Sequence, residues 1–446
     1  MIQKSFSIIT SQKIKKFNKR ITVDGDKSIS QRLLLIGAIS EGITKIDNML
    51  ESKDIFSAIE CLKKLGIKIR KKEGKYLVYG MGLGSLNIKK NTTLNFGNSG
   101  TLARLMIGIL STTPNISVKL QGDKSLNKRN MGELIKQMEK FGADFFPKTK
   151  YKFPLKLNSS NLPVGLEYVS GKSAQIKSAV MLAGLNSFGN TTIVEKFKSR
   201  NHTENILLNS PKCIKVKKGK ENLITIYGKK KLNSLQSEIP GDPSSAAFYV
   251  SLCLLSNNSK LLIKNVQLNP TRIGFYKILK EHGAKIFFKN LRKKNHEYVG
   301  DILVFSSKIK NLNVDKKFYV NSTDEYPIMF VIAALTSGVS IFKGIQGLKN
   351  KESDRIIEMQ KVLSQIGIKS IFNKDQLKIY GISKLESLKK SISVSSILDH
   401  RICMSTLILS LLTGIKSKIN NFETVSTSSP NFLKIIKSLG GKYEIK

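Results

Sequence analysis

The pattern of hydrophobic and polar residues predicts a structural repeat along the whole chain. Six segments read as an amphipathic helix, a turn and a short strand: 59–70, 135–146, 206–217, 276–288, 359–372 and 432–445. In five of them a glycine stands where the helix would end, a position that favours the left-handed conformation, and the third has a Ser-Pro turn instead. One such junction is common in α/β proteins, but six at intervals of roughly 75 residues indicate a supersecondary unit in three plus three copies.

Stretches rich in β-branched residues lie between these segments, for example 191–197 and 338–346. Each unit therefore contains helices and strands, an α/β design in which sheets pack on buried helices. A length of 446 residues favours two domains of roughly 200 residues over one core. The Gly-Asp-Pro turn at 241–243 marks the expected change from one half to the other.

The chain is strongly basic, with 75 Lys and Arg against 32 Asp and Glu and a net charge of +43. Such a charge is expected of a nucleic-acid binder, so a polyanion- or RNA-binding repeat protein is one alternative. The lysines are scattered, however, and no aromatic residues alternate with them as a base-stacking surface requires. We favour a solvated basic surface that raises the local concentration of an anionic substrate, with no nucleic-acid partner.

Several features argue against a secreted or membrane protein. The four cysteines are isolated from one another and form no CxxC motif, so we expect reduced thiols, a cytoplasmic location, and neither a disulfide framework nor a metal site. The basic N-terminal segment lacks the apolar core of a signal peptide. The longest apolar run, 402–415, is too short to span a bilayer and predicts a buried helix.

Arginine is scarce, and its positions are informative. Only 10 of the 75 basic residues are arginines, and six of these lie in short segments rich in Gly, Ser, Asp and Glu: Arg32, Arg104, Arg129, Arg200, Arg355 and Arg401. A guanidinium grips carboxylate or phosphate through two parallel hydrogen bonds, which lysine cannot do. Six retained arginines therefore predict one polyanion site assembled from distant loops.

Three of the predicted helix starts have the form of anion sites, with a strand, a Gly/Ser turn and then a helix. Lys27 and Ser28 precede an apolar helix, Gly100 opens a second, and Ser173 and Gln175 begin a third. Unpaired N–H groups and the helix dipole favour anions there. Each motif alone is as well explained by ordinary helix capping, so their co-occurrence with the arginines carries the prediction.

Carboxylates beside these cations are candidates for proton transfer. Asp324 and Glu325 precede a buried helix, where a helix-capping role is the ordinary alternative. Glu352 lies in the charged segment 351–355, which on the surface would be a simple charge cluster. Near a phosphate, such carboxylates can serve as acid or base. For His400 we favour a structural role, held by Asp399, over a proton shuttle.

The ordered motifs resemble the 3-phosphoshikimate 1-carboxyvinyltransferase (EPSP synthase) family over residues 24–430: DKSxSxR, GNSGTxxRL, GDxSLxxR, SAQxKS, SRxHTE, DExP, KESDR and DHR. The resemblance implies a monomeric α/β enzyme of two similar domains, each of three βαββαβ units in an inside-out α/β barrel. One domain would comprise 1–24 and 243–446 and the inserted one 25–242. A hinge near 22–25 and 240–243 would close a cleft on the substrates.

The implied reaction transfers the enolpyruvyl group of phosphoenolpyruvate to the 5-hydroxyl of shikimate 3-phosphate, with no metal or other cofactor. The resemblance implies that shikimate 3-phosphate is bound by Lys27, Ser28, Arg32, Ser173, Ala174, Gln175, Ser199, Asp324 and Lys351. It implies that phosphoenolpyruvate is bound by Lys27, Gly100, Arg129, Gln175, Arg355 and Arg401. Asp324 would be the base for the 5-hydroxyl, and Glu352 with Lys27 would move protons at the methylene carbon.

Some positions depart from the family pattern. Asn130 stands where proline is usual, Asn350 where a small apolar residue is usual, and Thr427 near where some members have a lysine. The alternative enzyme is UDP-N-acetylglucosamine 1-carboxyvinyltransferase, which shares the fold and phosphoenolpyruvate. It typically has Lys-Asn where this chain has Lys27-Ser28, and often a loop cysteine near Arg129 that this chain lacks.

Overall fold

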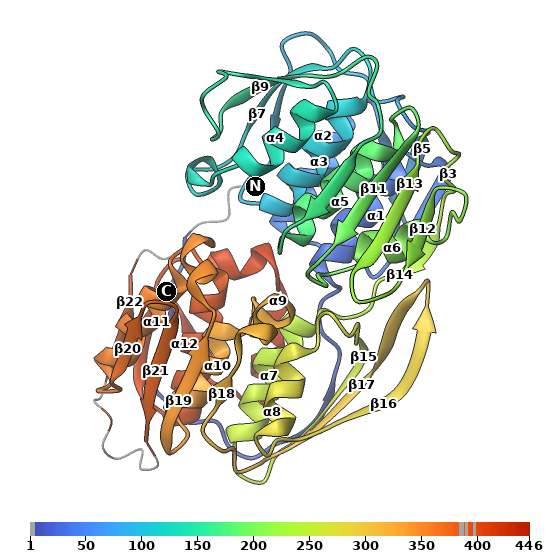
Figure 1. The fold of residues 1–446 in the computed structure, drawn as a ribbon. Helices are drawn as coiled ribbons and strands as arrows, with labels where there is room; N and C mark the ends of the chain where they lie inside the picture. Colours follow the sequence, from blue (N-terminus) through green and yellow to red (C-terminus); the bar gives the residue numbers. More distant parts are fainter. Residues whose placement is uncertain (1–4, 383–387, 389–390, 396–397) are drawn as a thin grey trace. The chain divides into compact units, whose positions relative to one another are not determined.

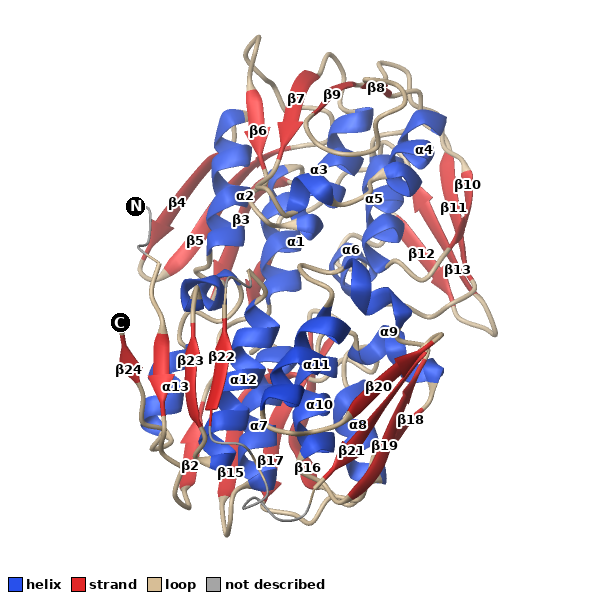
Figure 2. Ribbon diagram, turned by 90° about the vertical axis from the view of Figure 1, so that its left-hand side faces the viewer, coloured by secondary structure: helices blue, strands red, loops and turns tan. Residues whose placement is uncertain are grey.

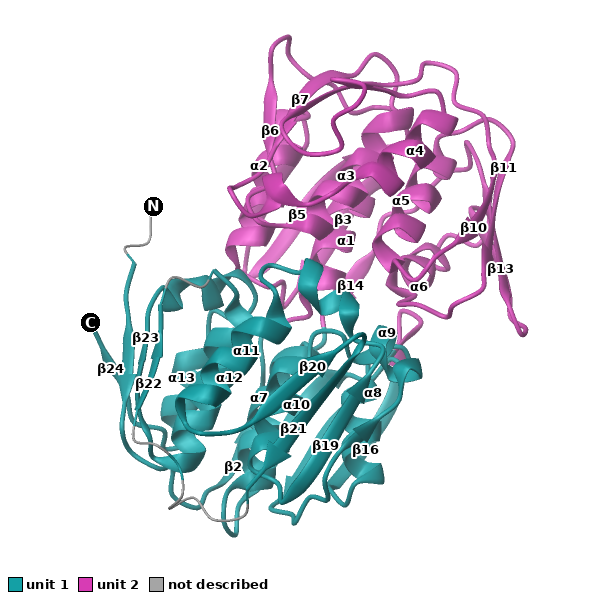
Figure 3. Ribbon diagram, turned by 60° about the vertical axis from the view of Figure 1, so that its left-hand side comes forward, with its two compact units in different colours: residues 1–24, 240–292, 298–446 teal, residues 25–239, 293–297 magenta. Residues whose placement is uncertain are grey.

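A computed structural model describes residues 5–382, 388, 391–395 and 398–446 of the chain (Figure 1). The chain divides into two compact units, coloured separately in Figure 3. Unit 1 comprises residues 1–24, 240–292 and 298–446, and unit 2 comprises residues 25–239 and 293–297. In no described part of the chain is a helix both long and apolar enough to cross a membrane.

Unit 2 contains three four-stranded sheets. In sheet order their strands are β14 (Gln236–Glu238), β3 (Glu41–Asp47), β5 (Lys75–Met81) and β4 (Lys68–Lys72); β6 (Thr93–Asn95), β7 (Ser117–Gln121), β9 (Leu155–Asn158) and β8 (Asp144–Phe146); and β10 (Glu167–Ser170), β11 (Asn190–Glu195), β13 (Asn222–Tyr227) and β12 (Ile214–Lys217). Its helices are α1 (Lys27–Ala38), α2 (Lys53–Lys64), α3 (Gly100–Thr112), α4 (Gly132–Lys140), α5 (Ala174–Leu185), α6 (His202–Leu207) and the 3-10 helix Leu126–Lys128.

Unit 1 repeats this organisation. In sheet order its strands are β16 (Lys285–Lys294), β17 (Glu297–Phe305), β15 (Lys260–Gln267) and β2 (Asn18–Ile21); β18 (Asn313–Val314), β19 (Gly338–Lys343), β21 (Gln376–Gly381) and β20 (Ser370–Asn373); and β22 (Ser391–Val394), β23 (Lys416–Ile419), β1 (Ile8–Thr10) and β24 (Glu444–Ile445). Its helices are α7 (Pro243–Leu255), α8 (Gly274–Glu281), α9 (Tyr319–Ser322), α10 (Tyr326–Ala334), α11 (Arg355–Gln365), α12 (His400–Thr413), α13 (Phe432–Ser438) and the 3-10 helices Lys316–Phe318, Gln346–Asn350 and Phe422–Thr427.

The predicted helix–turn–strand repeat is present in all six places. Each of the six repeats has a second helix followed by one strand of a four-stranded sheet, and these helices are α2, α4, α6, α8, α11 and α13. The five predicted glycines end their helices with φ between 84° and 98°, a conformation that side chains rarely adopt: Gly66, Gly142, Gly283, Gly367 and Gly440. The sequence pattern therefore identified the fold class correctly.

The order of elements within a repeat differs from the expected βαββαβ. In the third repeat it is β10–α5–β11–α6–β12–β13, that is βαβαββ. β10 is parallel to β11, and both β11 and β12 are antiparallel to β13, so each helix connects two strands of the same direction. The sequence pattern marks only the second helix and the strand after it, and so it could not show how the other strands are distributed.

Three sheets include a strand from a distant part of the chain, and in one of them β2 pairs in parallel with β15. β14, at the end of the long inserted stretch, pairs in parallel with β3 near its beginning. β1 pairs with both β23 and β24, so the two ends of the chain complete one sheet of unit 1. These pairings explain why the chain passes between the units after Asp24 and again near Pro240.

The unit boundaries differ from the expected domains at two places. Residues 240–242 belong to unit 1, where Gly241 bridges Val266 and the Asp242 N–H donates to the Asp24 carbonyl at 2.8 Å. Residues 293–297 group with unit 2, where Lys294 pairs with Glu238 at 2.6 Å. The Gly-Asp-Pro motif, from which the boundary was predicted, could not show either of these long-range contacts. The hinge near 22–25 and 240–243 stays a prediction.

The helices lie inside each unit and the sheets around them (Figure 2). The first helix of most repeats is therefore buried on nearly all sides: all residues of α10 are buried, as are all but the last of α7 and of α12. The second helices, such as α2 and α4, keep one polar face. Gly108 of α3 allows the close approach of α5, because a Cβ there would lie 2.5 Å from the Ala179 carbonyl oxygen.

Candidate active site

The predicted anion motifs of unit 2 open three of its buried helices. Asp26 caps α1 by accepting from the Ile29 N–H at 2.8 Å, Ser99 caps α3, and Ser173 caps α5. Lys27, the first residue of α1, pairs with Asp54 at 3.1 Å and keeps 21% of its side chain exposed. The motifs are thus real helix starts, as the capping alternative also requires.

Arg32 lies one turn into α1 and is buried. Its guanidinium donates to the Ser28 carbonyl at 3.0 Å, to the Thr203 hydroxyl at 2.9 Å and to the Ser178 hydroxyl at 3.2 Å. Helices α1, α5 and α6 therefore hold this arginine jointly, through one carbonyl and two hydroxyl oxygens.

Two further arginines converge on the start of α3. Arg104 donates to the Gly100 carbonyl at 3.1 Å and to the Gln175 side chain at 2.7 Å. Arg129 donates to Asn98. A Cβ on Gly100 would lie 2.8 Å from the Arg104 guanidinium and 3.0 Å from that of Arg129. Glycine is thus what allows both cations to reach this helix start.

Ser199 follows β11 and is buried. Its N–H and its hydroxyl both donate to Glu195, each at 3.0 Å. A phosphate can accept a hydrogen bond from this hydroxyl only if the bond to Glu195 is exchanged. Ala174 and Gln175 lie half-buried in the first turn of α5, where Gln175 also donates to Thr101 at 2.7 Å.

In unit 1 the predicted carboxylates surround one arginine. Arg355, buried at the start of α11, donates to Asp399 at 2.9 Å and to Glu352 at 2.7 Å, and lies 3.5 Å from Asp324. Burial alone would lower the pKa of Arg355, but these three carboxylates outweigh it and raise that pKa. Half-buried Lys351 precedes Glu352, at the end of a 3-10 helix.

Asp324 does not cap the helix that follows it. Glu325 occupies the N-cap position of α10, and no side-chain hydrogen bond caps the helix there. Asp324 instead points to Arg355 and keeps 22% of its side chain exposed. The ordinary capping alternative for Asp324 is therefore wrong.

Asp399 caps α12 by accepting from the Arg401 N–H at 2.9 Å, while its other oxygen binds Arg355. Arg401 is buried, and its guanidinium lies 5.8 Å from the centre of the Phe248 ring. His400 Nδ1 lies 3.5 Å from the Thr427 hydroxyl. Thr427, at a position where some relatives were expected to have lysine, thus neighbours the histidine.

The comparisons with known proteins agree with the motifs. A family model described as EPSP synthase (3-phosphoshikimate 1-carboxyvinyltransferase) matches residues 11–436. The 3-phosphoshikimate 1-carboxyvinyltransferase of Paramagnetospirillum magneticum is 36% identical over 424 residues, 94% of each chain. That of Zymomonas mobilis is 35% identical and covers 98% of this chain and 97% of its own. An EPSP synthase structure from Acinetobacter baumannii has a TM-score of 0.84 at 31% identity and covers 99% of this chain and all of its own.

The chain belongs to the EPSP synthase family. It is an enzyme, a transferase of the shikimate pathway to aromatic amino acids. Of the two enolpyruvyl transferases considered from the sequence, the family match selects the first, and it sets aside the polyanion-binding alternative.

In this EPSP synthase family member, sequence reasoning named Glu325 beside Asp324 but missed the buried group that it forms with Ser244 and Arg272. Glu325 contacts the Ser244 hydroxyl, which Arg272 reaches at 2.8 Å while also pairing with Asp242 at 3.1 Å. Burial, and then the charge of Asp324, raise the pKa of Glu325. Arg272 lies in a TRI segment without the Gly, Ser and acidic neighbours that marked the other arginines. Only its place as one of ten arginines could have drawn attention to it.

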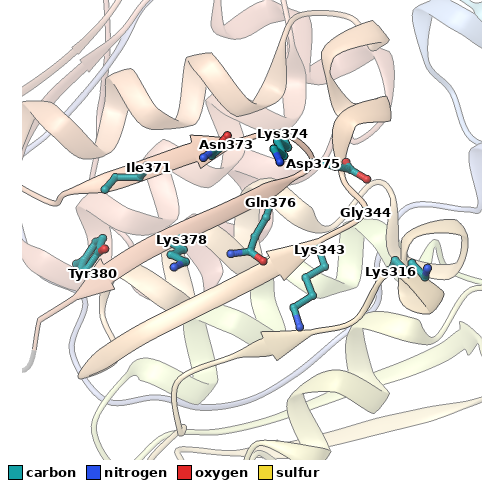
Figure 4. Close-up of a pocket in the computed structure, with 10 residues that line it drawn as sticks. All are labelled: Lys316, Lys343, Gly344, Ile371, Asn373, Lys374, Asp375, Gln376, Lys378 and Tyr380. Atoms are coloured by element: carbon teal, nitrogen blue, oxygen red, sulfur yellow. The ribbon is translucent and has the colours of Figure 1, made fainter.

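A hollow of about 580 Å³ lies elsewhere, on the outer face of the sheet of β19, β20 and β21 (Figure 4). Lysines line much of it, including Lys343 and Lys378, over a floor that includes Ile371 and Tyr380. None of its lining residues belongs to either cluster described above. In the described residues, no group of three His, Cys, Asp or Glu side chains could hold a metal ion.

Proposed function

We propose that two clusters carry the reaction of the family. The cationic cluster of unit 2 comprises Lys27, Arg32, Arg104 and Arg129, and the Arg355 cluster of unit 1 comprises Arg355 with Asp324, Glu352 and Asp399. That reaction transfers the enolpyruvyl group of phosphoenolpyruvate to the 5-hydroxyl of shikimate 3-phosphate and gives 5-enolpyruvylshikimate 3-phosphate and phosphate. The carrying observation is that the predicted motifs fall within the family match to residues 11–436 and bring their side chains together within each unit.

Both substrates are anions, and the residues proposed for them offer cations and hydrogen-bond donors. Shikimate 3-phosphate is assigned to Lys27, Ser28, Arg32, Ser173, Ala174, Gln175, Ser199, Asp324 and Lys351. Phosphoenolpyruvate is assigned to Lys27, Gly100, Arg129, Gln175, Arg355 and Arg401. The α3 start supports the second assignment, because two guanidinium groups meet there at a helix N-terminus.

The catalytic roles follow from the proton balance. Addition of a proton to the methylene carbon of phosphoenolpyruvate creates a cationic centre at the adjacent carbon, which the 5-hydroxyl attacks as its proton passes to Asp324. Loss of a proton from the new methyl group and departure of phosphate then restore the double bond. We assign the proton transfers at carbon to Lys27 and Glu352, and the grip on the departing phosphate to the arginines.

Arg355 supports this division of roles. It lies 3.5 Å from Asp324 and donates to Glu352 at 2.7 Å, so that one cation orients both carboxylates assigned to proton transfer. We further propose that the enzyme works as a monomer in the cytoplasm. Its four cysteines are buried, and none of them forms a disulfide in the described residues, which suits a reducing compartment.

A phosphate-release assay tests the proposal. The purified chain with phosphoenolpyruvate and shikimate 3-phosphate should release one phosphate for each enolpyruvyl ether formed. Mass spectrometry identifies and counts the ether product. UDP-N-acetylglucosamine, offered as the control acceptor, should give no release. Turnover with the control acceptor, or none with shikimate 3-phosphate, would refute the assignment.

A further inference from the structure

Three buried charges of unit 2 lie beside Arg32 and Ser199, two of the residues assigned to shikimate 3-phosphate. The Lys177 ammonium is 2.5 Å from a carboxylate oxygen of Glu195 and 2.5 Å from one of Glu204. The three side chains are 0%, 3% and 4% exposed, respectively. None of the three belongs to the substrate assignments above.

Burying three charges is costly, so the cluster requires an explanation. Burial would lower the pKa of Lys177, but the two glutamates outweigh it and raise that pKa. Burial would raise the pKa of Glu195, but Lys177 and the bonds to Ser199 and Asn222 outweigh it and lower that pKa. Buried ion pairs are often no better for stability than apolar residues of the same size. A role in positioning neighbouring groups therefore accounts for the cluster better than stability does.

One arm of the cluster leads to Ser199. Glu195 is the last residue of β11, and the oxygen that pairs with Lys177 also accepts both hydrogen bonds from Ser199. Its other oxygen accepts from Asn222 at 2.7 Å. Lys177 thus fixes the carboxylate that fixes Ser199.

The other arm leads to Arg32. Two hydroxyls accept from its guanidinium, that of Ser178 next to Lys177 in α5 and that of Thr203 next to Glu204 in α6. The Thr203 hydroxyl also donates to Ser178 at 2.8 Å. The Lys177–Glu204 pair therefore joins α5 to α6, two of the three helices that hold Arg32.

We propose that Lys177, with Glu195 and Glu204, is a positioning residue for the phosphate of shikimate 3-phosphate. It sets Ser199 through β11 and Arg32 through α5 and α6, without touching the substrate itself. The inference rests on the proposed function, which assigns Arg32 and Ser199 to this substrate. Arg32 and Ser199, which these contacts reach, are taken here as ligands of the phosphate group, so the effect should be confined to that group.

The test compares the affinity for shikimate 3-phosphate with that for shikimate, which lacks the phosphate. Lys177→Met leaves two unpaired glutamates and can fail to fold, so the main variant is the charge-neutral triple change Lys177→Met, Glu195→Gln and Glu204→Gln. Glu204→Gln alone is the milder variant, and Lys140→Met on the exposed side of α4 is the matched control. Titration calorimetry gives both affinities, and circular dichroism checks folding.

We expect the triple variant to bind shikimate 3-phosphate about ten-fold more weakly and to bind shikimate as the parent does. Glu204→Gln should lose about three-fold for the phosphorylated ligand alone, and Lys140→Met nothing. An equal loss for both ligands in the folded variants, or no loss, would overturn the positioning role. A parent protein that does not bind shikimate 3-phosphate would instead refute the proposed function.

Discussion

The two clusters use arginine in opposite surroundings. In unit 2, Arg32 and Arg104 donate to hydroxyl, backbone carbonyl and amide oxygens. In unit 1, Arg355 meets three carboxylates. Neutral acceptors orient a guanidinium without an opposite charge, whereas a carboxylate pairs with its charge. On the proposed assignment, the same residue type serves an anion site in one unit and a proton-transfer site in the other.

The difference has exceptions that make it testable. Lys27 in unit 2 pairs with the carboxylate of Asp54, so that this cation, proposed to move protons, resembles the unit 1 arrangement. Arg401 in unit 1 lies over Phe248 and is assigned to anion binding, as the unit 2 arginines are. The comparison thus follows the proposed role more closely than the unit.

Asp324→Asn should have the largest effect. The amide keeps the shape but cannot accept the 5-hydroxyl proton, so we expect turnover to fall by roughly 100-fold or more with folding unchanged. Phosphate release at saturating substrates measures it, with exposed Asp315→Asn as the control. Turnover within a few-fold of the parent would show that Asp324 is not the base and would weaken the comparison.

Arg401→Lys tests whether anion binding extends into unit 1. A lysine cannot make the two parallel bonds of a guanidinium, so we expect the KM for phosphoenolpyruvate to rise about ten-fold. The matched change in unit 2, Arg129→Lys, should act in the same direction. An unchanged KM in the Arg401 variant, beside a raised one in the Arg129 variant, would confine phosphoenolpyruvate binding to unit 2.

The sequence predicted the repeat and the helix starts well because both depend on local chemistry. The left-handed glycines and the capping residues Asp26, Ser99 and Ser173 announce themselves within a few positions. The strand order did not follow in the same way, because β14 and β1 pair with strands far away in the chain.

The pairing of the supporting charges could not be predicted either, although Lys177 and Glu204 lie within the motifs SAQxKS and SRxHTE. Lys177 stands in an apolar helix and Glu204 in a six-residue one, and only the fold brings each to within 2.5 Å of its partner. Arg272 and Glu325 meet through Ser244, from three separate elements. A sequence shows which residues can bind an anion, but the groups that position them are set by long-range packing.

Gly100→Ala should have a smaller effect that sharpens the unit 2 side. Its Cβ would stand within 3.0 Å of both the Arg104 and Arg129 guanidinium groups, which are the mobile ends of long side chains and can shift. We expect a several-fold higher KM for phosphoenolpyruvate and unchanged affinity for shikimate 3-phosphate by calorimetry. A greater loss for shikimate 3-phosphate would move this helix start to the other substrate.

The smallest effect expected is an opposite pH dependence of stability for one buried glutamate in each unit. The pKa of Glu195 is lowered, so its contribution to stability is present above its ordinary pKa of 4.5 and is lost as the pH falls below that value. The pKa of Glu325 is raised, so its contribution is present below 4.5 and is lost as the pH rises.

Glu195→Gln should therefore lower the melting temperature at pH 8, and Glu325→Gln should raise it, by about 2–4 °C for each kcal/mol. Both differences should shrink toward pH 4 in melting curves recorded between pH 4 and 9. Shifts of the same sign in the two variants at pH 8 would mean that burial and pairing are balanced alike in both units, which contradicts the comparison.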